Sequence, residues 1–207
     1  MNVNVSAPRH PPTLVIVPGL GNSGPDHWQT HLENAHAGSV RVEQKHWDFP
    51  VRGAWTRALD RTLAEIAGPV ALAVHSLGVL TVAEWARRFP PRANVVGALL
   101  VAPPDTEGSL PAGIPPAWLL RLLGWSPIPR ERLPWPSTLV ASTSDRLCTL
   151  PRAEAFARAW GSAFVNLGAA GHINTAAGYG VWPEAERLIA AFAGAPSART
   201  RLAVTQE

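Results

Sequence analysis

Short apolar runs rich in β-branched residues alternate along this chain with segments of helical period, and this alternation limits the fold more than any other feature. The predicted strands are Thr13–Val17, Val40–Glu43, Val70–Val74, Val95–Val101, Thr138–Ala141 and Ala163–Leu167, and the predicted helices are His27–Ala35, Trp55–Ala67, Leu77–Phe89, Arg152–Trp160 and Trp182–Phe192. Near-continuous apolar strands that alternate with helices are typical of a mostly parallel sheet covered on both faces. We therefore predict an α/β fold of three layers, α/β/α.

The amount of apolar sequence is enough for one domain with a sizeable core. Of the 207 residues, 46% are hydrophobic and 16% are charged, which argues against disorder over most of the chain. We expect the domain to span residues 13–193, with flexible ends at 1–12 and 194–207. Residues 103–136 hold nine prolines and three tryptophans, too many prolines for a regular strand or one long helix. We predict a lid-like insertion there, with a short helix at Trp118–Leu123.

Several classes of protein are excluded by what the chain lacks. It has no apolar run of about 18 residues that could span a bilayer, and its first residues do not have the pattern of a signal peptide. The single cysteine, Cys148, excludes an internal disulfide and a cysteine-based metal cluster. The 17 arginines and one lysine are scattered, whereas a nucleic-acid binder concentrates them on one face. We expect a cytoplasmic protein that binds neither membranes nor nucleic acids.

Three residues with catalytic chemistry each follow a predicted strand. Ser76, Asp145 and His172 come in the chain order serine, aspartate, histidine, which is the order expected of an α/β-hydrolase. The carboxyl ends of parallel strands meet at one edge of the sheet, so these side chains should lie together. A serine hydroxyl needs an imidazole to take its proton, and the imidazole needs a carboxylate to fix its tautomer. The alternative for Ser76 is a simple cap of the following helix.

The surroundings of Ser76 match a nucleophile elbow except at one position. Gly78 is small enough for the sharp turn, but Val74 stands where a glycine or alanine is usual, which predicts local crowding. The backbone amides of Leu77 and Leu20 are the predicted oxyanion donors. The triad acid has an alternative, because Asp105 follows the preceding strand. Asp145 is favoured because it is tied to the sheet by a short turn.

These motifs resemble a known family. The segments Pro18–Gln29, His75–Gly78, Gly171–Asn174 and Gly178–Glu184, together with Asp145, are similar to the small serine hydrolases related to retinoblastoma-binding protein 9 and YdeN. The resemblance covers about residues 13–192. It implies a reduced α/β-hydrolase fold of six parallel strands in the order 2-1-3-4-5-6, with a minimal cap. It also implies a Ser76–Asp145–His172 triad with carboxylesterase-type activity. We therefore predict a serine esterase that cleaves small acyl esters and needs no cofactor or metal. Neither the natural substrate nor the oligomeric state follows from it.

Other functions are open to the same residues. Gly19–Gly24 reads G-x-G-x-x-G, and Glu43 lies where a ribose-binding carboxylate would sit, as in a dinucleotide-binding protein. Pro25 argues against it, because the helix should begin only there. A catalytically weak hydrolase fold that binds partners is a further alternative.

Histidine and tryptophan side chains near the glycine-rich turn allow further interpretations. His27 and His31 have the spacing of a metalloprotease site, but Trp28 replaces the glutamate that such a site needs. Trp28 is instead predicted to bind substrate because it follows the oxyanion turn. Trp47 and Trp118 are weaker candidates for the same pocket, since buried tryptophans are more often core residues.

Overall fold

The six predicted strands form one parallel sheet. The computed structural model describes residues 11–92 and 94–193. The strands are β1 (Thr13–Val17), β2 (Val40–Arg41), β3 (Val70–His75), β4 (Val95–Val101), β5 (Ser137–Ala141) and β6 (Ala163–Asn166). Their order is β2-β1-β3-β4-β5-β6, and every neighbouring pair is parallel. The predicted α/β fold and strand order are confirmed.

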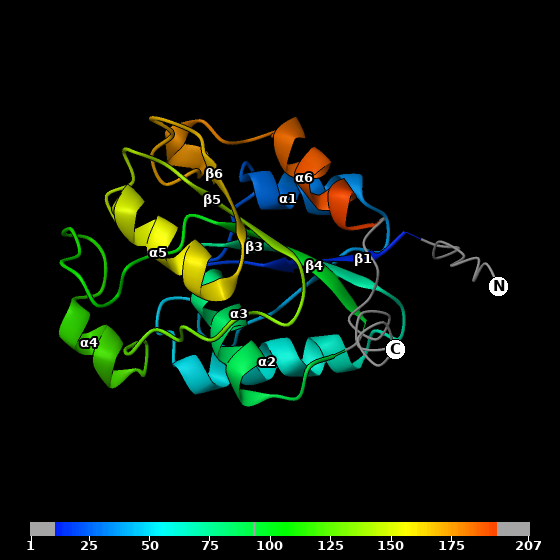
Figure 1. Cartoon of the computed structure of the whole chain (residues 1–207), viewed down its shortest axis with the longest axis horizontal. Helices are drawn as coiled ribbons and strands as arrows, with labels where there is room; N and C mark the ends of the chain where they lie inside the picture. The colour runs from blue at the N-terminus through cyan, green and yellow to red at the C-terminus, as the bar shows by residue number, and fades with distance from the viewer. Residues whose placement is uncertain (1–10, 93, 194–207) are drawn as a thin grey trace, which may run out of the picture.

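Helices cover both faces of this sheet (Figure 1). The helices of the described residues are α1 (Trp28–Ala35), α2 (Arg52–Ala64), α3 (Leu77–Arg88), α4 (Ala117–Leu122), α5 (Leu150–Trp160) and α6 (Pro183–Ala193), with a 3₁₀ turn at Thr175–Ala177. The α1 and α6 helices lie on one face, and α2 and α3 lie on the other. Each predicted helix is present, and the largest difference is in α2, which begins and ends three residues before its predicted range. No helix among the described residues is both long and apolar enough to cross a membrane.

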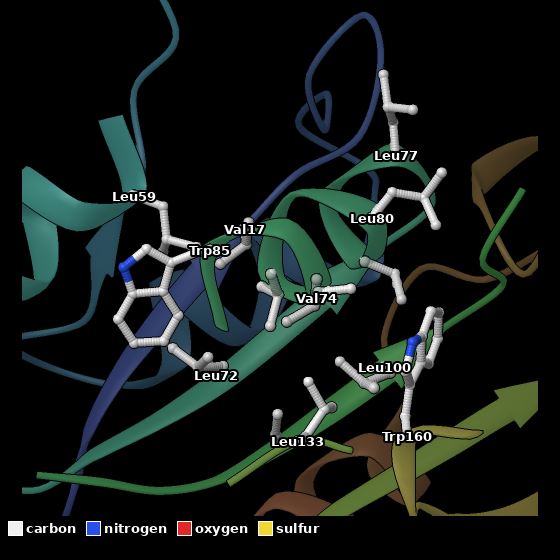
Figure 2. Close-up of a cluster of buried hydrophobic side chains, with 14 of the residues drawn as sticks. Val17, Leu59, Leu72, Val74, Leu77, Leu80, Trp85, Leu100, Leu133 and Trp160 are labelled. Atoms are coloured by element: carbon white, nitrogen blue, oxygen red, sulfur yellow. The ribbon is translucent and has the colours of Figure 1, made fainter. Parts of the chain in front are cut away.

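The core is divided into two clusters because successive strand side chains point to opposite faces. On β3, Leu72 and Val74 pack with α2 and α3, whereas Ala71 and Ala73 pack with α1 and α6. Figure 2 shows the first cluster, with Val74 among its labelled members. Val74 is fully buried there and lies in register with Val17 on one side and Leu100 on the other. The cluster thus accommodates the side chain that departs from the usual elbow sequence.

The start of α3 packs closely against the end of β1 through Gly78. A Cβ atom at Gly78 would lie 2.5 Å from the Val17 carbonyl oxygen and 2.7 Å from that of Pro18. These neighbours are backbone atoms at the end of β1 and directly after it, so they cannot move aside without a shift of the strand end. The glycine is therefore what lets the helix begin directly after β3.

Replacement of Gly78 by alanine is expected to lower the free energy of unfolding by at least ~2 kcal/mol, as overpacking in a dense core does. Gly24→Ala is the matched control, because a Cβ atom there meets nothing within 4 Å. Urea unfolding of both variants checks this expectation. Equal stability of the two variants would contradict the close approach at Gly78.

The proline-rich segment 103–136 is only partly a surface loop. It contains α4, close to the predicted Trp118–Leu123 helix. Its second half is anchored in the core by buried side chains, namely Trp125, Ile128, Leu133 and Trp135. The ends that we predicted to be flexible, 1–12 and 194–207, lie outside the described residues except for Pro11 and Pro12.

Candidate active site

The turn between β3 and α3 holds Ser76 in an unusual backbone conformation. Its φ is 53° and its ψ is −125°, a region that residues other than glycine rarely adopt. The Ser76 amide donates to the Val101 carbonyl oxygen at 2.9 Å, which fixes the turn to β4. Such strain persists only where the surrounding structure enforces it, and it clusters at active sites. The turn therefore has the geometry of a nucleophile elbow, and Ser76 is not a simple helix cap, since its side chain makes no capping bond.

A continuous series of hydrogen bonds joins the three predicted residues. Ser76 Oγ lies 2.9 Å from His172 Nε2, and His172 Nδ1 lies 2.9 Å from Asp145 Oδ2. The other carboxylate oxygen, Asp145 Oδ1, accepts from the Leu147 amide at 2.9 Å. The carboxylate is thus fixed by the backbone and oriented toward the imidazole. Three residues from the ends of β3, β5 and β6 meet as their positions in the sequence predicted.

The loop that carries His172 is held by polar contacts from three other elements. The buried His75 ring hydrogen-bonds through Nε2 to the His172 carbonyl oxygen at 3.0 Å. Trp28 Nε1 donates to the Ile173 carbonyl oxygen at 3.0 Å, and Ser144 Oγ accepts from the Gly171 amide at 2.9 Å. These contacts fix the imidazole relative to the serine, which is what a precise catalytic geometry requires.

The two predicted oxyanion donors belong to neighbouring turns. A Cβ atom at Gly19 would lie 3.2 Å from the Leu77 amide nitrogen and 2.7 Å from Ser76 Cβ, so the glycine-rich turn and the elbow are in contact. Within the part of the chain that the structure describes, the amides of Leu20 and Leu77 donate to no protein acceptor. Both residues line the same cavity as Ser76. The amides are therefore available to a bound oxygen.

Ser76 and His172 lie at a cavity of about 200 Å³. One part of its wall is apolar and comes largely from the proline-rich segment; its residues include Leu110, Ile114, Leu120 and Leu147. The other part is polar and includes Asn22, His27, His75, Thr106 and Asn174. No charged side chain from residues 11–92 or 94–193 lines it. A small uncharged molecule fits such a site.

The prediction that Trp28 binds substrate is wrong. Trp28 is fully buried between α1 and the sheet, where its ring packs edge-on against Trp182 and His75. It supports the His172 loop through the hydrogen bond to Ile173 and does not line the cavity. Its position one residue after His27 turns it toward the core while His27 turns toward the cavity. Trp47 and Trp118 do not line the cavity either.

Two buried histidines beside His172 are held in the neutral form. Burial, and then the charges of Arg41 and His172, lowers the pKa of His27 from 6.5 to about 4. Burial, followed by His172 and His27, holds the pKa of His75 well below its usual range. His31 points elsewhere, and no group of three metal-binding side chains is found among the described residues. His27 and His31 line different cavities.

These histidines should make the protein less stable in mild acid. His27 binds protons more readily in the unfolded chain than in the folded one, so stability is lost as pH falls from about 6.5 toward 4. The His27 contribution should amount to about 2 kcal/mol between pH 7 and pH 5. Chemical unfolding at both pH values, with His27→Asn for comparison, measures it. An equal loss of stability in the variant would contradict the neutral state of His27.

The remaining candidates have structural roles. Cys148 is buried, and burial together with Asp105 and Asp145 raises the pKa of its thiol to about 12, so it cannot act as a thiolate nucleophile. Asp105, the alternative triad acid, forms two hydrogen bonds to Arg152, at 2.8 and 3.1 Å. Its carboxylate is therefore occupied away from His172.

The dinucleotide alternative is not supported by the glycine-rich turn. Gly19 is needed for the approach to Ser76, and α1 begins four residues after Gly24, with His27 as its N-cap. The helix start therefore does not follow the third glycine as it does in a dinucleotide site. Pro25 precedes the helix rather than starting it.

Several cavity residues were not found by sequence reasoning. Leu110, Ile114 and Leu120 lie in an aperiodic segment where no pattern predicts which side chains face inward. Asn174 and His75 lie inside the motifs that contain His172 and Ser76. Their closeness to these residues in the sequence could have indicated that they line the cavity.

Comparisons with known proteins agree with this geometry. A family model described as serine hydrolase matches residues 14–191. A structure described as a YdeN-like hydrolase from Pectobacterium atrosepticum is 31% identical, covers 88% of this chain and 91% of its own, and has a TM-score of 0.74. The YdeN structure from Bacillus subtilis is 17% identical, with coverage of 87% and 98% and a TM-score of 0.70.

The fold is shared more widely. The esterase domain of a Rhodothermus marinus protein is 17% identical, with coverage of 92% and 89% and a TM-score of 0.63. No curated protein sequence matches the chain. The resemblance to YdeN-like serine hydrolases is confirmed, while that to retinoblastoma-binding protein 9 stays a prediction. With most of its residues covered by the family model, the chain belongs to the serine hydrolase family.

Proposed function

We propose that this protein is a carboxylesterase that cleaves small acyl esters through an acyl-enzyme. The observation that carries the proposal is the unbroken series of hydrogen bonds from Asp145 through His172 to Ser76 beside the cavity. Each member has the partner that its chemical role requires. The comparisons support hydrolase chemistry, and the ester as substrate is our inference from the site.

In the first half of the reaction, His172 Nε2 takes the proton of Ser76 as Oγ attacks the acyl carbonyl carbon. Asp145 stabilises the imidazolium that forms and keeps the remaining proton on Nδ1. The carbonyl oxygen becomes negative and accepts hydrogen bonds from the amides of Leu20 and Leu77. His172 then gives its proton to the alcohol oxygen, the bond from the acyl carbon to that oxygen breaks, and Ser76 is left acylated.

In the second half, water replaces the alcohol. His172 takes a proton from the water, the hydroxide attacks the acyl carbon, and the serine leaves with the proton returned by His172. The products are a carboxylic acid and the free enzyme. At the end of the cycle, Ser76, His172 and Asp145 have regained their initial protonation states.

The size and lining of the cavity support a short acyl group. An apolar cavity of ~150 Å³ holds a benzene molecule, so the ~200 Å³ here suits an acyl group of a few carbon atoms. We propose that residues 103–136 act as a lid, because Leu110, Ile114 and Leu120 form much of the apolar wall. Their side chains would cover the acyl group and exclude water from it.

Labelling with a fluorophosphonate tests the proposal directly. The probe should modify wild-type protein at one residue, and peptide mass spectrometry should locate the adduct on Ser76. The same preparation should hydrolyse 4-nitrophenyl acetate and butyrate, and prior labelling should abolish this activity. Absence of both labelling and hydrolysis would overturn the proposal in favour of a partner-binding protein with a hydrolase fold.

A further inference from the structure

The polar wall of the cavity presents hydrogen-bond donors that the protein leaves unused. Its members outside the Ser76–His172 pair include Asn22, His27 and Asn174. In each of them, the accepting atom of the side chain already binds a donor of the protein. The N–H groups that remain are those a ligand can reach.

His27 is the clearest case. Its Nδ1 accepts a hydrogen bond from the Gln29 amide at 3.2 Å, so the ring proton is on Nε2. The residue is only 5% exposed and lines the cavity, and among the described residues no protein acceptor binds its Nε2–H. This N–H group is therefore free to donate to a ligand oxygen in the cavity.

The two asparagines have the same arrangement. Asn22 Oδ1 accepts from the Ser23 amide and from Arg41 Nη1, both at 2.8 Å. Asn174 Oδ1 accepts from the Ala177 amide at 3.1 Å. These bonds fix which end of each amide is oxygen, and within residues 11–92 and 94–193 neither side-chain NH₂ has a protein acceptor. Together with the His27 ring, the two NH₂ groups are therefore donors that a carbonyl oxygen of a ligand can accept from.

The position of His172 indicates which half of an ester meets this wall. The His75 ring lies 5.0 Å from the His172 ring and 4.7 Å from the His27 ring, measured between ring centres, so the polar wall adjoins the catalytic imidazole. His172 has to pass its proton to the leaving oxygen, which places the alcohol half beside it. The apolar wall is then left for the acyl group.

We propose that the substrates are esters whose alcohol half carries a neutral carbonyl oxygen, bound by His27, Asn22 and Asn174. This inference rests on the proposed esterase function. The carbonyl is neutral because no charged side chain from the described residues lines the cavity. The nearby Arg41 guanidinium is already bound by Glu33, Asn22 and Thr30.

Two butyrate esters of the same shape provide the test. Acetonyl butyrate carries a ketone in its alcohol half, and methallyl butyrate has a CH₂ group in place of that oxygen. The measured quantity is the ratio of the two kcat/KM values. This ratio is compared between wild type and each variant, so that the intrinsic reactivity of the esters cancels.

The first variant is His27→Asn, which keeps a side chain that can cap α1 but removes the ring N–H. Its ratio should fall roughly 3- to 10-fold, as expected for one lost hydrogen bond.

Asn174→Asp is a second, independent variant. It keeps the oxygen that binds the Ala177 amide and replaces the NH₂ donor, so its ratio should fall in the same direction. His31→Asn is the matched control, because His31 is on the same helix but does not line the cavity. It should leave the ratio unchanged.

The outcomes separate this inference from the proposed function. Ratios within twofold of wild type in both variants would overturn the inference while ester hydrolysis stands. Ethyl 4-oxopentanoate and ethyl 4-methylpent-4-enoate carry the ketone or the CH₂ group in the acyl half. If the variants lower the kcat/KM ratio of this pair instead, the assignment to the alcohol half is overturned. If wild type hydrolyses none of these esters and Ser76 is not labelled, the proposed function fails and the inference fails with it.

Discussion

Ser76→Ala is expected to lower kcat for ester hydrolysis by about 10⁶-fold, the size of the loss when a serine protease loses its nucleophile. The alanine cannot form the acyl-enzyme, and His172 without Ser76 Oγ has no nucleophile to activate. The variant should also fail to react with a fluorophosphonate. Steady-state hydrolysis of 4-nitrophenyl butyrate and intact-protein mass spectrometry measure the two effects.

The backbone of Ser76 provides a control for this result. Alanine has to adopt the same strained φ of 53°, whereas glycine adopts it more easily. Ser76→Gly should therefore be equally inactive but more stable than Ser76→Ala, by about 1–3 kcal/mol. Fluorophosphonate labelling of Ser76→Ala at the wild-type rate would show that another residue is the nucleophile.

Asp145→Asn is expected to lower kcat by about 10⁴-fold, as the same change does in serine proteases. The Leu147 amide binds Asp145 Oδ1, so it should hold the oxygen of the asparagine and direct the new NH₂ group toward His172 Nδ1. The imidazole would then carry its proton on Nε2, which faces Ser76. In that tautomer it cannot accept the serine proton. Hydrolysis assays near neutral pH measure the loss.

Asp105→Asn is the matched control. Its carboxylate binds Arg152 and lies outside the series that includes His172, so kcat should change by less than about tenfold. Any loss should be in stability, because Arg152 would lose part of its ion pairing. A large loss of kcat in Asp105→Asn together with normal turnover in Asp145→Asn would reverse the assignment of the triad acid.

Local pattern was enough to predict the sheet and the residues that meet at its edge. Apolar residues repeat with different periods in strands and in helices. The apolar pattern of β3 and the longer period of α3 could therefore each be recognised without knowledge of the rest of the fold. Parallel strands all end at the same edge of the sheet. The positions of Ser76, Asp145 and His172 directly after strands were therefore sufficient to predict that these residues lie together. The order of the strands came from the family resemblance rather than from the pattern.

The walls of the cavity could be determined only by the tertiary structure. Trp28 and His27 are adjacent in the sequence, yet the direction of α1 turns the first into the core and the second toward the cavity. Leu110 and Ile114 lie between prolines in a segment without a period, so nothing in the sequence indicated which side chains face Ser76. The partner of Asp105 is Arg152, 47 residues away, and this pairing removes Asp105 from the active site. Contacts of this kind depend on how helices and loops pack across the sheet, and that packing is a property of the whole chain rather than of any local segment.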